Sequence, residues 1–245
     1  MRNIRITIEY DGTRYNGWQR QPNGTTIQEL LETAVEKIVN HKIKIIGSGR
    51  TDAGVHAINQ IANFRTGSAI PEYNLVRAIN SMLPPDIAVK DLVEAEESFH
   101  ARYDAKCKLY VYYLYNREVR SPLLDRYSWH YRGRLDTEKM QEALEGIKGT
   151  HNFSSFCASG DDAADHVRTV FDASVTHCKN GMITFMIEAD GFLRYMVRNI
   201  VGTLIEAGND KISPGEIKNI LASENRNMAG ITAPPRGLFL KEVRY

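Results

Sequence analysis

Residues 47–57 read GSGRTDAGVHA and bring together the side chains most suited to chemistry in the chain. Three glycines give this stretch backbone freedom that other residues lack. It lies between residues 43–46 and 58–64, where β-branched and apolar residues predict strands. Gly, Ser and Asp are ordinary turn residues, so the stretch is at least a turn. Polar groups gathered in a loop between two strands are also a common location for catalysis.

The spacing excludes two nucleotide-binding motifs. Gly49 and Gly54 have the separation of a Walker-type phosphate loop, but the Lys and Ser or Thr that must follow are replaced by Val and His. A dinucleotide-binding Gly-x-Gly-x-x-Gly fails because Asp52 stands at the third glycine position. What remains is the Asp52 carboxylate beside the fixed positive charge of Arg50. A nearby Arg favours the ionised form of a carboxylate, which can act as nucleophile or base.

The nine residues 49–57 resemble the signature of the tRNA pseudouridine synthases of the TruA type. Further segments resemble motifs of that family in the same order along the chain: GWQRQP at 17–22, KLYVY at 108–112, RTV at 168–170, FLRYMVRN at 192–199 and GLFL at 237–240. The resemblance runs from residue 10 to residue 240. It implies an isomerase that makes pseudouridine at positions 38, 39 and 40 of the tRNA anticodon arm. It also implies a homodimer, with each tRNA touching both subunits.

The resemblance assigns roles to individual residues. Asp52 is the expected catalytic carboxylate, Arg50 lies beside it in sequence, and Arg198 is expected to pair with it. Tyr110 is expected to lie against the target uracil, and Leu238 to form a wall of the uracil pocket. The expected substrate-binding residues on the RNA backbone are Arg14, Arg20 and Arg168.

The chemistry of the implied reaction needs no cofactor or metal. Pseudouridine forms when the N-glycosidic bond breaks, the uracil turns, and its C5 joins the ribose, with no redox change. One carboxylate suffices, either as a nucleophile on the sugar or as a base that produces a glycal, and the sequence leaves both open. A hydrolytic glycosidase would need two carboxylates, and only Asp52 stands out.

Composition is that of an ordinary soluble globular protein, with 42% apolar and 25% charged residues in 245. The sequence shows no signal peptide and no apolar run long enough to span a membrane. Cys107, Cys157 and Cys178 are odd in number and scattered, which argues against a disulfide framework or a zinc site and favours the cytoplasm. The net charge of only +1 means that an RNA partner requires a local basic surface.

The element pattern predicts an α+β fold. Alternating Ile4, Ile6 and Ile8 predict a strand, and Thr26 opens a capping box before a helix. Strands over 43–46 and 58–64, a helix over 73–82 and a strand over 87–93 follow. The order β, α, β, β, α, β is that of a split βαβ, ferredoxin-like (RRM-like) unit, here a first domain over 1–104 that carries the Asp52 loop.

Residues 105–245 are expected to form a second ferredoxin-like domain, with the antiparallel sheets of the two domains flanking a central active-site cleft. Strands are predicted over 106–115, 127–131, 171–178 and 182–189, the last two joined by an Asn-Gly turn. A helix should start after Asp136 and stop at Gly149, and another should span 192–207 with Arg194 and Arg198 on one edge. A capped helix after residue 213 and a strand after residue 237 complete the chain.

Two functions of other classes remain as alternatives. A non-catalytic RNA-binding module on the same scaffold explains the four tyrosines of residues 110–115 and the basic loops. It does not explain an acidic Asp52 in a glycine-rich loop, because a carboxylate weakens phosphate binding. An enzyme acting on small nucleosides is disfavoured by the basic loops and by the lack of a nucleotide-phosphate motif.

Overall fold

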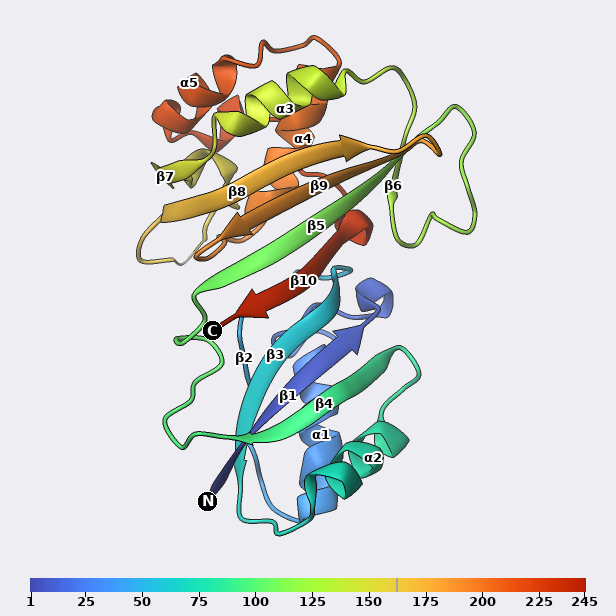
Figure 1. Cartoon of the computed structure of the whole chain (residues 1–245), viewed down its shortest axis with the longest axis vertical. Helices are drawn as coiled ribbons and strands as arrows, with labels where there is room; N and C mark the ends of the chain where they lie inside the picture. Colours follow the sequence, from blue (N-terminus) through green and yellow to red (C-terminus); the bar gives the residue numbers. More distant parts are fainter. Residues whose placement is uncertain (162) are drawn as a thin grey trace. The chain divides into compact units, whose positions relative to one another are not determined.

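The computed structural model describes residues 1–161 and 163–245, which form a mixed α+β fold (Figure 1). The chain divides into two compact units. The first unit contains Met1–Lys106 together with Phe239–Tyr245, and the second contains Cys107–Leu238.

The first unit is built on β1 (Arg2–Tyr10), β2 (Ile46–Gly47), β3 (His56–Thr66), β4 (Ile87–Ala95) and β10 (Leu238–Arg244). Strand β1 lies between β3 and β4 and is antiparallel to both. Strands β2 and β10 both pair with β3, β2 antiparallel and β10 parallel. The predicted alternation in β1 is confirmed, because Ile4, Ile6 and Ile8 are all fully buried.

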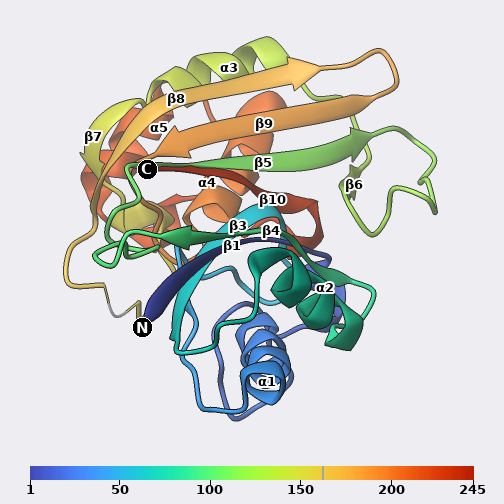
Figure 2. The ribbon, with the colours of Figure 1, turned by 60° about the horizontal axis from the view of Figure 1, so that its bottom comes forward.

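Two helices cover one side of these strands, α1 (Ile27–Val39) and α2 (Glu72–Met82), as Figure 2 shows. The predicted cap of α1 is confirmed, since the Thr26 side chain accepts a hydrogen bond from the Glu29 amide at 3.4 Å. Ile27, Leu31 and Val35 recur at helical spacing on one face of α1 and are buried in the core.

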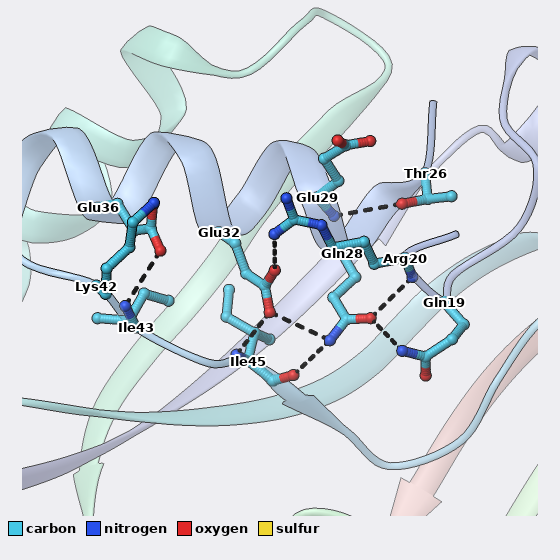
Figure 3. A network of polar contacts seen from close by, with 10 residues as sticks. All are labelled: Gln19, Arg20, Thr26, Gln28, Glu29, Glu32, Glu36, Lys42, Ile43 and Ile45. Atoms are coloured by element: carbon cyan, nitrogen blue, oxygen red, sulfur yellow. Dashed lines mark hydrogen bonds and ion pairs between the residues drawn. The ribbon is translucent and has the colours of Figure 1, made fainter. Parts of the chain in front are cut away.

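The predicted strand over residues 43–46 is mostly wrong, because only Ile46 of that run belongs to β2. The backbone of Ile45 is bonded to helix side chains instead of a neighbouring strand. Its amide donates to Glu32 Oε1 at 3.1 Å, and its carbonyl accepts from Gln28 Nε2 at 2.9 Å (Figure 3). Two buried polar side chains of α1 therefore take the place of the backbone hydrogen bonds to a neighbouring strand, which the β-branched residues alone would favour.

The second unit has the strand order β5-β9-β8-β7, with every neighbouring pair antiparallel. These strands are β5 (Cys107–Asn116), β7 (Gly149–Asn152), β8 (Val167–His177) and β9 (Met182–Ala189). A short β6 (Trp129–Tyr131) runs parallel to β5. The predicted Asn180-Gly181 hairpin is confirmed: Gly181 has φ of +86° and its amide donates to the Cys178 carbonyl.

Helices α3 (Thr137–Glu145), α4 (Met196–Gly208) and α5 (Glu216–Ser223) belong to the second unit. Asp136 caps α3 as predicted, accepting from the amides of the second and third helical residues. The predicted stop at Gly149 is wrong, because α3 ends at Glu145 and Gly149 already begins β7. Short 3₁₀ turns occupy Gly12–Arg14, Ser154–Phe156, Arg226–Met228 and Pro235–Gly237.

Helix α4 starts four residues later than predicted. Tyr195 at its N-cap has φ of +66°, a left-handed conformation that cannot belong to the helix. The carbonyl of Arg194 accepts from the Ala158 amide at 2.9 Å, so this backbone is bonded to another loop. Arg194 therefore does not share a helix edge with Arg198.

The structural units differ from the expected domain ranges at both boundaries. The second unit starts at Cys107, and Phe239–Tyr245 joins the first unit. This happens because β10 pairs with β3 through Phe239 and Leu240, while the Lys106 amide donates to the Arg244 carbonyl at 2.8 Å.

Among the described residues, no helix has the length and apolar character that a membrane crossing requires.

Candidate active site

The Asp52 loop joins β2 to β3 in the first unit and is anchored at its start by buried side chains. Ser48 Oγ donates to Gln60 Oε1 at 2.6 Å, and Gln60 Nε2 donates to the Gly49 carbonyl at 3.0 Å. Ser48 and Gln60 are both fully buried. Buried polar groups satisfied in this way fix the local backbone, because breaking either bond leaves an unpaired partner.

The middle of the loop is fixed through Thr51. Its hydroxyl lies 2.8 Å from the Tyr10 hydroxyl, and its carbonyl accepts from the Trp18 amide at 3.1 Å. Burial raises the pKa of the Tyr10 phenol well above its ordinary value, so this phenol stays protonated. The Val55 amide then donates to the Asp52 carbonyl at 3.1 Å and closes a turn. Asp52 thus lies in the turn between two buried residues, Thr51 and Val55. Asp52 itself is half-buried, whereas Arg50 is exposed.

The polar loop after β1 packs directly against the Asp52 loop. A Cβ on Gly17, which has φ of +85°, would lie 2.4 Å from the Thr51 carbonyl oxygen. A Cβ on Gly12 would lie 1.9 Å from the Val55 carbonyl oxygen. Both glycines are required by this close approach. Two motifs separated in the sequence, residues 17–22 and 49–57, therefore form one structural element.

A buried imidazole completes this junction, and no separate role was predicted for it. His56 is 1% exposed, and its Nδ1 lies 3.1 Å from the Gly12 amide and 3.2 Å from Asp11 Oδ1. Its ring stacks on Phe239 of β10, with centroids 4.5 Å apart. The histidine of the motif thus ties the Asp52 loop to the loop after β1. No spacing rule could have found these contacts, because the partners of His56 come from two segments far from it in the sequence.

Arg14 and Arg20, the predicted phosphate contacts of the first unit, are each paired with a carboxylate. Arg14 Nε and Nη2 both donate to Asp86 Oδ2, at 2.8 and 2.6 Å, and Tyr15 donates to the other oxygen. Burial alone would raise the pKa of Asp86, but the hydrogen bonds from Tyr15 and Arg14 outweigh it and lower that pKa. The Asp86 partner was missed from the sequence because it sits 72 residues away, in the turn before β4.

Arg20 belongs to a network that Figure 3 shows around Glu32 and Gln28. Its Nη1 lies 3.3 Å from Glu32 Oε2, and its amide donates to Gln28 Oε1 at 2.9 Å. Glu32 is 8% exposed at its side chain, whereas Arg20 is 60% exposed. The guanidinium therefore reaches the surface while its loop is held to α1.

Tyr110, the predicted uracil contact, lies on β5 of the second unit and is 7% exposed. Its ring meets Phe192 edge to face, with centroids 4.9 Å apart and planes at 80°. Tyr112 shares its face but is a packing residue: it is fully buried, and its hydroxyl donates to the Pro234 carbonyl at 2.9 Å. Tyr112 thus packs as a residue inside a sheet ordinarily does, which was expected for most of the four tyrosines of β5.

Arg198 is half-buried on the first turn of α4. Its Nε donates to the Ala233 carbonyl at 2.7 Å, and its own carbonyl accepts from the Ala233 amide at 3.1 Å. Its guanidinium carbon lies 4.8 Å from the centroid of the Tyr195 ring. The unusual left-handed Tyr195 is therefore the residue that supports this guanidinium from one side.

Arg168 and Leu238 lie at other points of the second unit. Arg168, near the start of β8, has Nη1 bonded to the Asp165 carbonyl at 3.1 Å and to the Val167 carbonyl. A Cβ on Gly191, next to Phe192, would lie 3.4 Å from its Nε. Leu238 is 5% exposed at the start of β10. The structure thus brings Arg168 close to the segment that touches Tyr110, and leaves Arg50 and Asp52 together in the first unit.

The family profile described as tRNA pseudouridine synthase matches residues 6–104 and 132–245. The tRNA pseudouridine synthase A of Thermoanaerobacter sp. (strain X514) is 47% identical over 245 residues, and that of Geotalea uraniireducens (strain Rf4) is 48% identical over 246. Both alignments cover 100% of this chain and 100% of the relative.

A solved structure of an H/ACA RNP bound to a substrate RNA containing 2'-deoxyuridine aligns at 14% identity and a TM-score of 0.38. The alignment covers 82% of this chain and 44% of that one, and a similarity this low supports no argument. The full-length relatives and the family profile decide the assignment: the chain belongs to the TruA-type family of tRNA pseudouridine synthases.

Proposed function

We propose that this protein isomerises uridine to pseudouridine in tRNA. The observation that carries the proposal is the Asp52 loop, in which a half-buried carboxylate sits on a turn between anchored neighbours. Catalysis by a carboxylate depends on holding it in one productive geometry. An RNA-binding module has no need of such a fixed acid, because an acid repels phosphate.

The reaction conserves the atoms of the nucleoside. The bond between uracil N1 and ribose C1′ breaks, the base turns, and a bond forms between C5 and C1′. The proton on C5 leaves, and N1 gains one. Asp52 acts either by attacking C1′ or by removing a ribose proton to give a glycal, and both routes need one ionised carboxylate.

The remaining residues position the substrate. The Tyr110 ring, oriented by Phe192, stacks on the target uracil, and Leu238 supplies an apolar wall. The uridine must leave its stack to reach the carboxylate, which costs a few kcal/mol and least in loops and at stem ends. Arg50 and Arg198 act near the reacting groups, and Arg14, Arg20 and Arg168 contact phosphates.

The substrate that we propose is the anticodon arm, with uridines at positions 38, 39 and 40 as targets. Support comes from the motif resemblance and from relatives named tRNA pseudouridine synthase A. By the same resemblance the protein works as a homodimer, and its scattered cysteines favour the cytoplasm.

The finer fold that we propose is a ferredoxin-like, split βαβ arrangement in each of two domains, the first of which carries Asp52. In the first unit its support is the strand order β4-β1-β3-β2 with α1 and α2 as connections. In the second unit it is the order β5-β9-β8, with α3 between β5 and β8 in the chain.

The test is tritium release from tRNA labelled at uracil C5. Release requires cleavage of the C5–H bond, so neither an RNA-binding module nor a glycosidase would produce it. We expect release from a transcript with uridine at 38, 39 or 40 and none when all three are cytidine. A protein that binds the transcript tightly without any release is the non-catalytic module.

A further inference from the structure

Three metal-ligating side chains of the second unit converge outside the proposed active-site residues: Cys157, Asp161 and His166. Each offers one ligand atom, and the three atoms all lie within 4.8 Å of one another. The separation between His166 Nε2 and Asp161 Oδ2 is 4.0 Å. The cysteine pattern predicted no zinc motif because the ligands are a Cys, an Asp and a His with gaps of three and four residues.

The backbone brings these residues together through ordinary loop bonds. Cys157 is the C-cap of the 3₁₀ turn Ser154–Phe156, and the Asp161 amide donates to the Ala158 carbonyl at 3.2 Å. The His166 carbonyl accepts from the Phe153 amide at 2.9 Å, which returns the chain to the start of the loop. Convergence is therefore a property of the backbone and not of side-chain rotamers alone.

The cluster contains a buried polar atom without a partner. His166 Nε2 is buried and has no hydrogen bond to any described residue. Native proteins rarely leave such an atom unsatisfied, and a bound ion is one of the groups that can satisfy it. Cys157 is 4% exposed, and the Asp161 side chain is 9% exposed.

We propose that Cys157, Asp161 and His166 form a binding site for a divalent transition-metal cation of the Zn²⁺ class. A thiolate, an imidazole and a carboxylate match the ligand preference of Zn²⁺, whereas Mg²⁺ and Ca²⁺ require oxygen ligands. One thiolate and one carboxylate balance the two positive charges of the ion, so the loaded site is neutral. Water supplies the fourth ligand of the tetrahedron.

The geometry requires only small movements. Zinc bonds of about 2.0–2.3 Å at tetrahedral angles place ligand atoms about 3.4–3.6 Å apart. The distance between His166 Nε2 and Asp161 Oδ2, 4.0 Å, must therefore shorten by roughly half an ångström. On binding, the thiol proton passes to solvent, so each ion releases about one proton.

The site is independent of the isomerisation and does not rest on it. His166 lies two residues before Arg168, at the start of β8. A bound ion would link Cys157 and Asp161 to His166. It brings two positive charges and displaces about one proton, so the local net charge rises by one. The expected consequence is a less negative surface ahead of Arg168, a predicted RNA contact.

The test is a titration of the chelator-treated full chain with Co²⁺, which occupies Zn²⁺ sites and reports thiolate ligands by a near-ultraviolet charge-transfer band. We expect one equivalent of Co²⁺ to produce the band, about one proton to be released, and Zn²⁺ to abolish the band by competition. Cys157→Ser and His166→Ala should lose the band, and Asp161→Asn should bind at least about tenfold more weakly.

His177 and Cys178, which are consecutive in the sequence and both exposed, provide the matched control. His177→Ala and Cys178→Ser should keep the band, and apo Cys157→Ser should unfold at the same temperature as apo wild type. Zn²⁺ should raise the unfolding temperature of wild type but not of Cys157→Ser. A band that survives Cys157→Ser, or no stoichiometric binding by wild type, would overturn the site.

Discussion

Two proposed site arginines of the first unit, Arg14 and Arg20, are held by a different kind of partner from Arg198 of the second unit. In the first unit, Arg14 is bonded to the carboxylate of Asp86 and Arg20 to that of Glu32. In the second unit, Arg198 is bonded to the carbonyl of Ala233 and lies over the ring of Tyr195. A carboxylate offsets the charge of a guanidinium, whereas a carbonyl and an aromatic ring orient it.

This difference separates two uses of an arginine. A phosphate can reach Arg14 or Arg20 only by competing with a carboxylate, so each exchange yields a modest gain in affinity. A guanidinium fixed by a carbonyl and an aromatic ring is held in one geometry, which suits a contribution to the reaction itself. Single substitutions test this division, beginning with the carboxylate at the centre of the proposed reaction.

Asp52→Asn should lower turnover by at least roughly 10³-fold, as the loss of a catalytic nucleophile or base does. Binding of tRNA should stay within a few-fold of wild type, because Asp52 makes no phosphate contact in this proposal. Single-turnover tritium release and a filter-binding titration measure the two effects. Asn preserves the size of the side chain, so unfolding temperature serves as the control. Multiple turnover near the wild-type rate would end the assignment of Asp52.

Local patterns in the sequence predicted most of the elements. Capping residues Thr26 and Asp136, the alternation in β1 and the Asn-Gly hairpin all depend on neighbouring residues, and all are confirmed. The failures involve distant partners. The backbone of Ile43 and Ile45 is bonded to α1 side chains. Tyr195 lies outside α4, where the carbonyl of its neighbour Arg194 accepts from the Ala158 amide. Propensity carries no information about such partners.

The candidate site shows the same limit. Residue types and spacing identified the Asp52 loop, because its glycines and charges are adjacent. They could not show that Gln60 anchors Ser48 and the Gly49 carbonyl, or that His56 contacts Gly12. The acid partners of Arg14 and Arg20 were likewise invisible, since ion pairs across 72 and 12 residues have no local signature.

Arg198→Ala should lower turnover by about 10²- to 10³-fold, the usual effect of removing one fixed electrostatic contact at a reacting centre. The slope of log affinity against log salt should hardly change, because no phosphate contact is lost. Arg198→Lys should recover little, since an ammonium cannot reproduce both the Nε bond to Ala233 and the contact with Tyr195. An unchanged turnover with a flatter salt slope would place Arg198 among the phosphate contacts.

Arg14→Ala and Arg20→Ala should do the reverse. Each should weaken tRNA binding by several-fold and flatten the salt slope by at most roughly one unit, since one phosphate contact is removed. Turnover at saturating tRNA should stay near wild type. Salt titrations of both variants beside Arg198→Ala measure the contrast. If Arg20→Ala and Arg198→Ala behave alike, the division between the two kinds of arginine is wrong.

Asp86→Asn should have the smallest effect of these substitutions. It should strengthen tRNA binding, whereas Arg14→Ala and Arg20→Ala should weaken it. In this variant a phosphate no longer has to displace the Asp86 carboxylate from Arg14. The affinity for tRNA at low salt should therefore rise by about threefold, and the slope of log affinity against log salt should steepen. Asp91→Asn, at an exposed position on β4, is the matched control and should change neither.

The same variant has a defined effect on acid stability. Because hydrogen bonds from Tyr15 and Arg14 lower the pKa of Asp86 in the folded protein, its ionised form stabilises the fold above the unfolded pKa of about 3.9. That contribution is lost as the pH falls through the lowered folded pKa. The gap in unfolding temperature between wild type and Asp86→Asn should therefore be largest near neutral pH and close below about pH 4. A gap that stays constant down to about pH 2.5, below the ordinary carboxyl range, would mean that Asp86 acts by packing and that Arg14 was not neutralised by it.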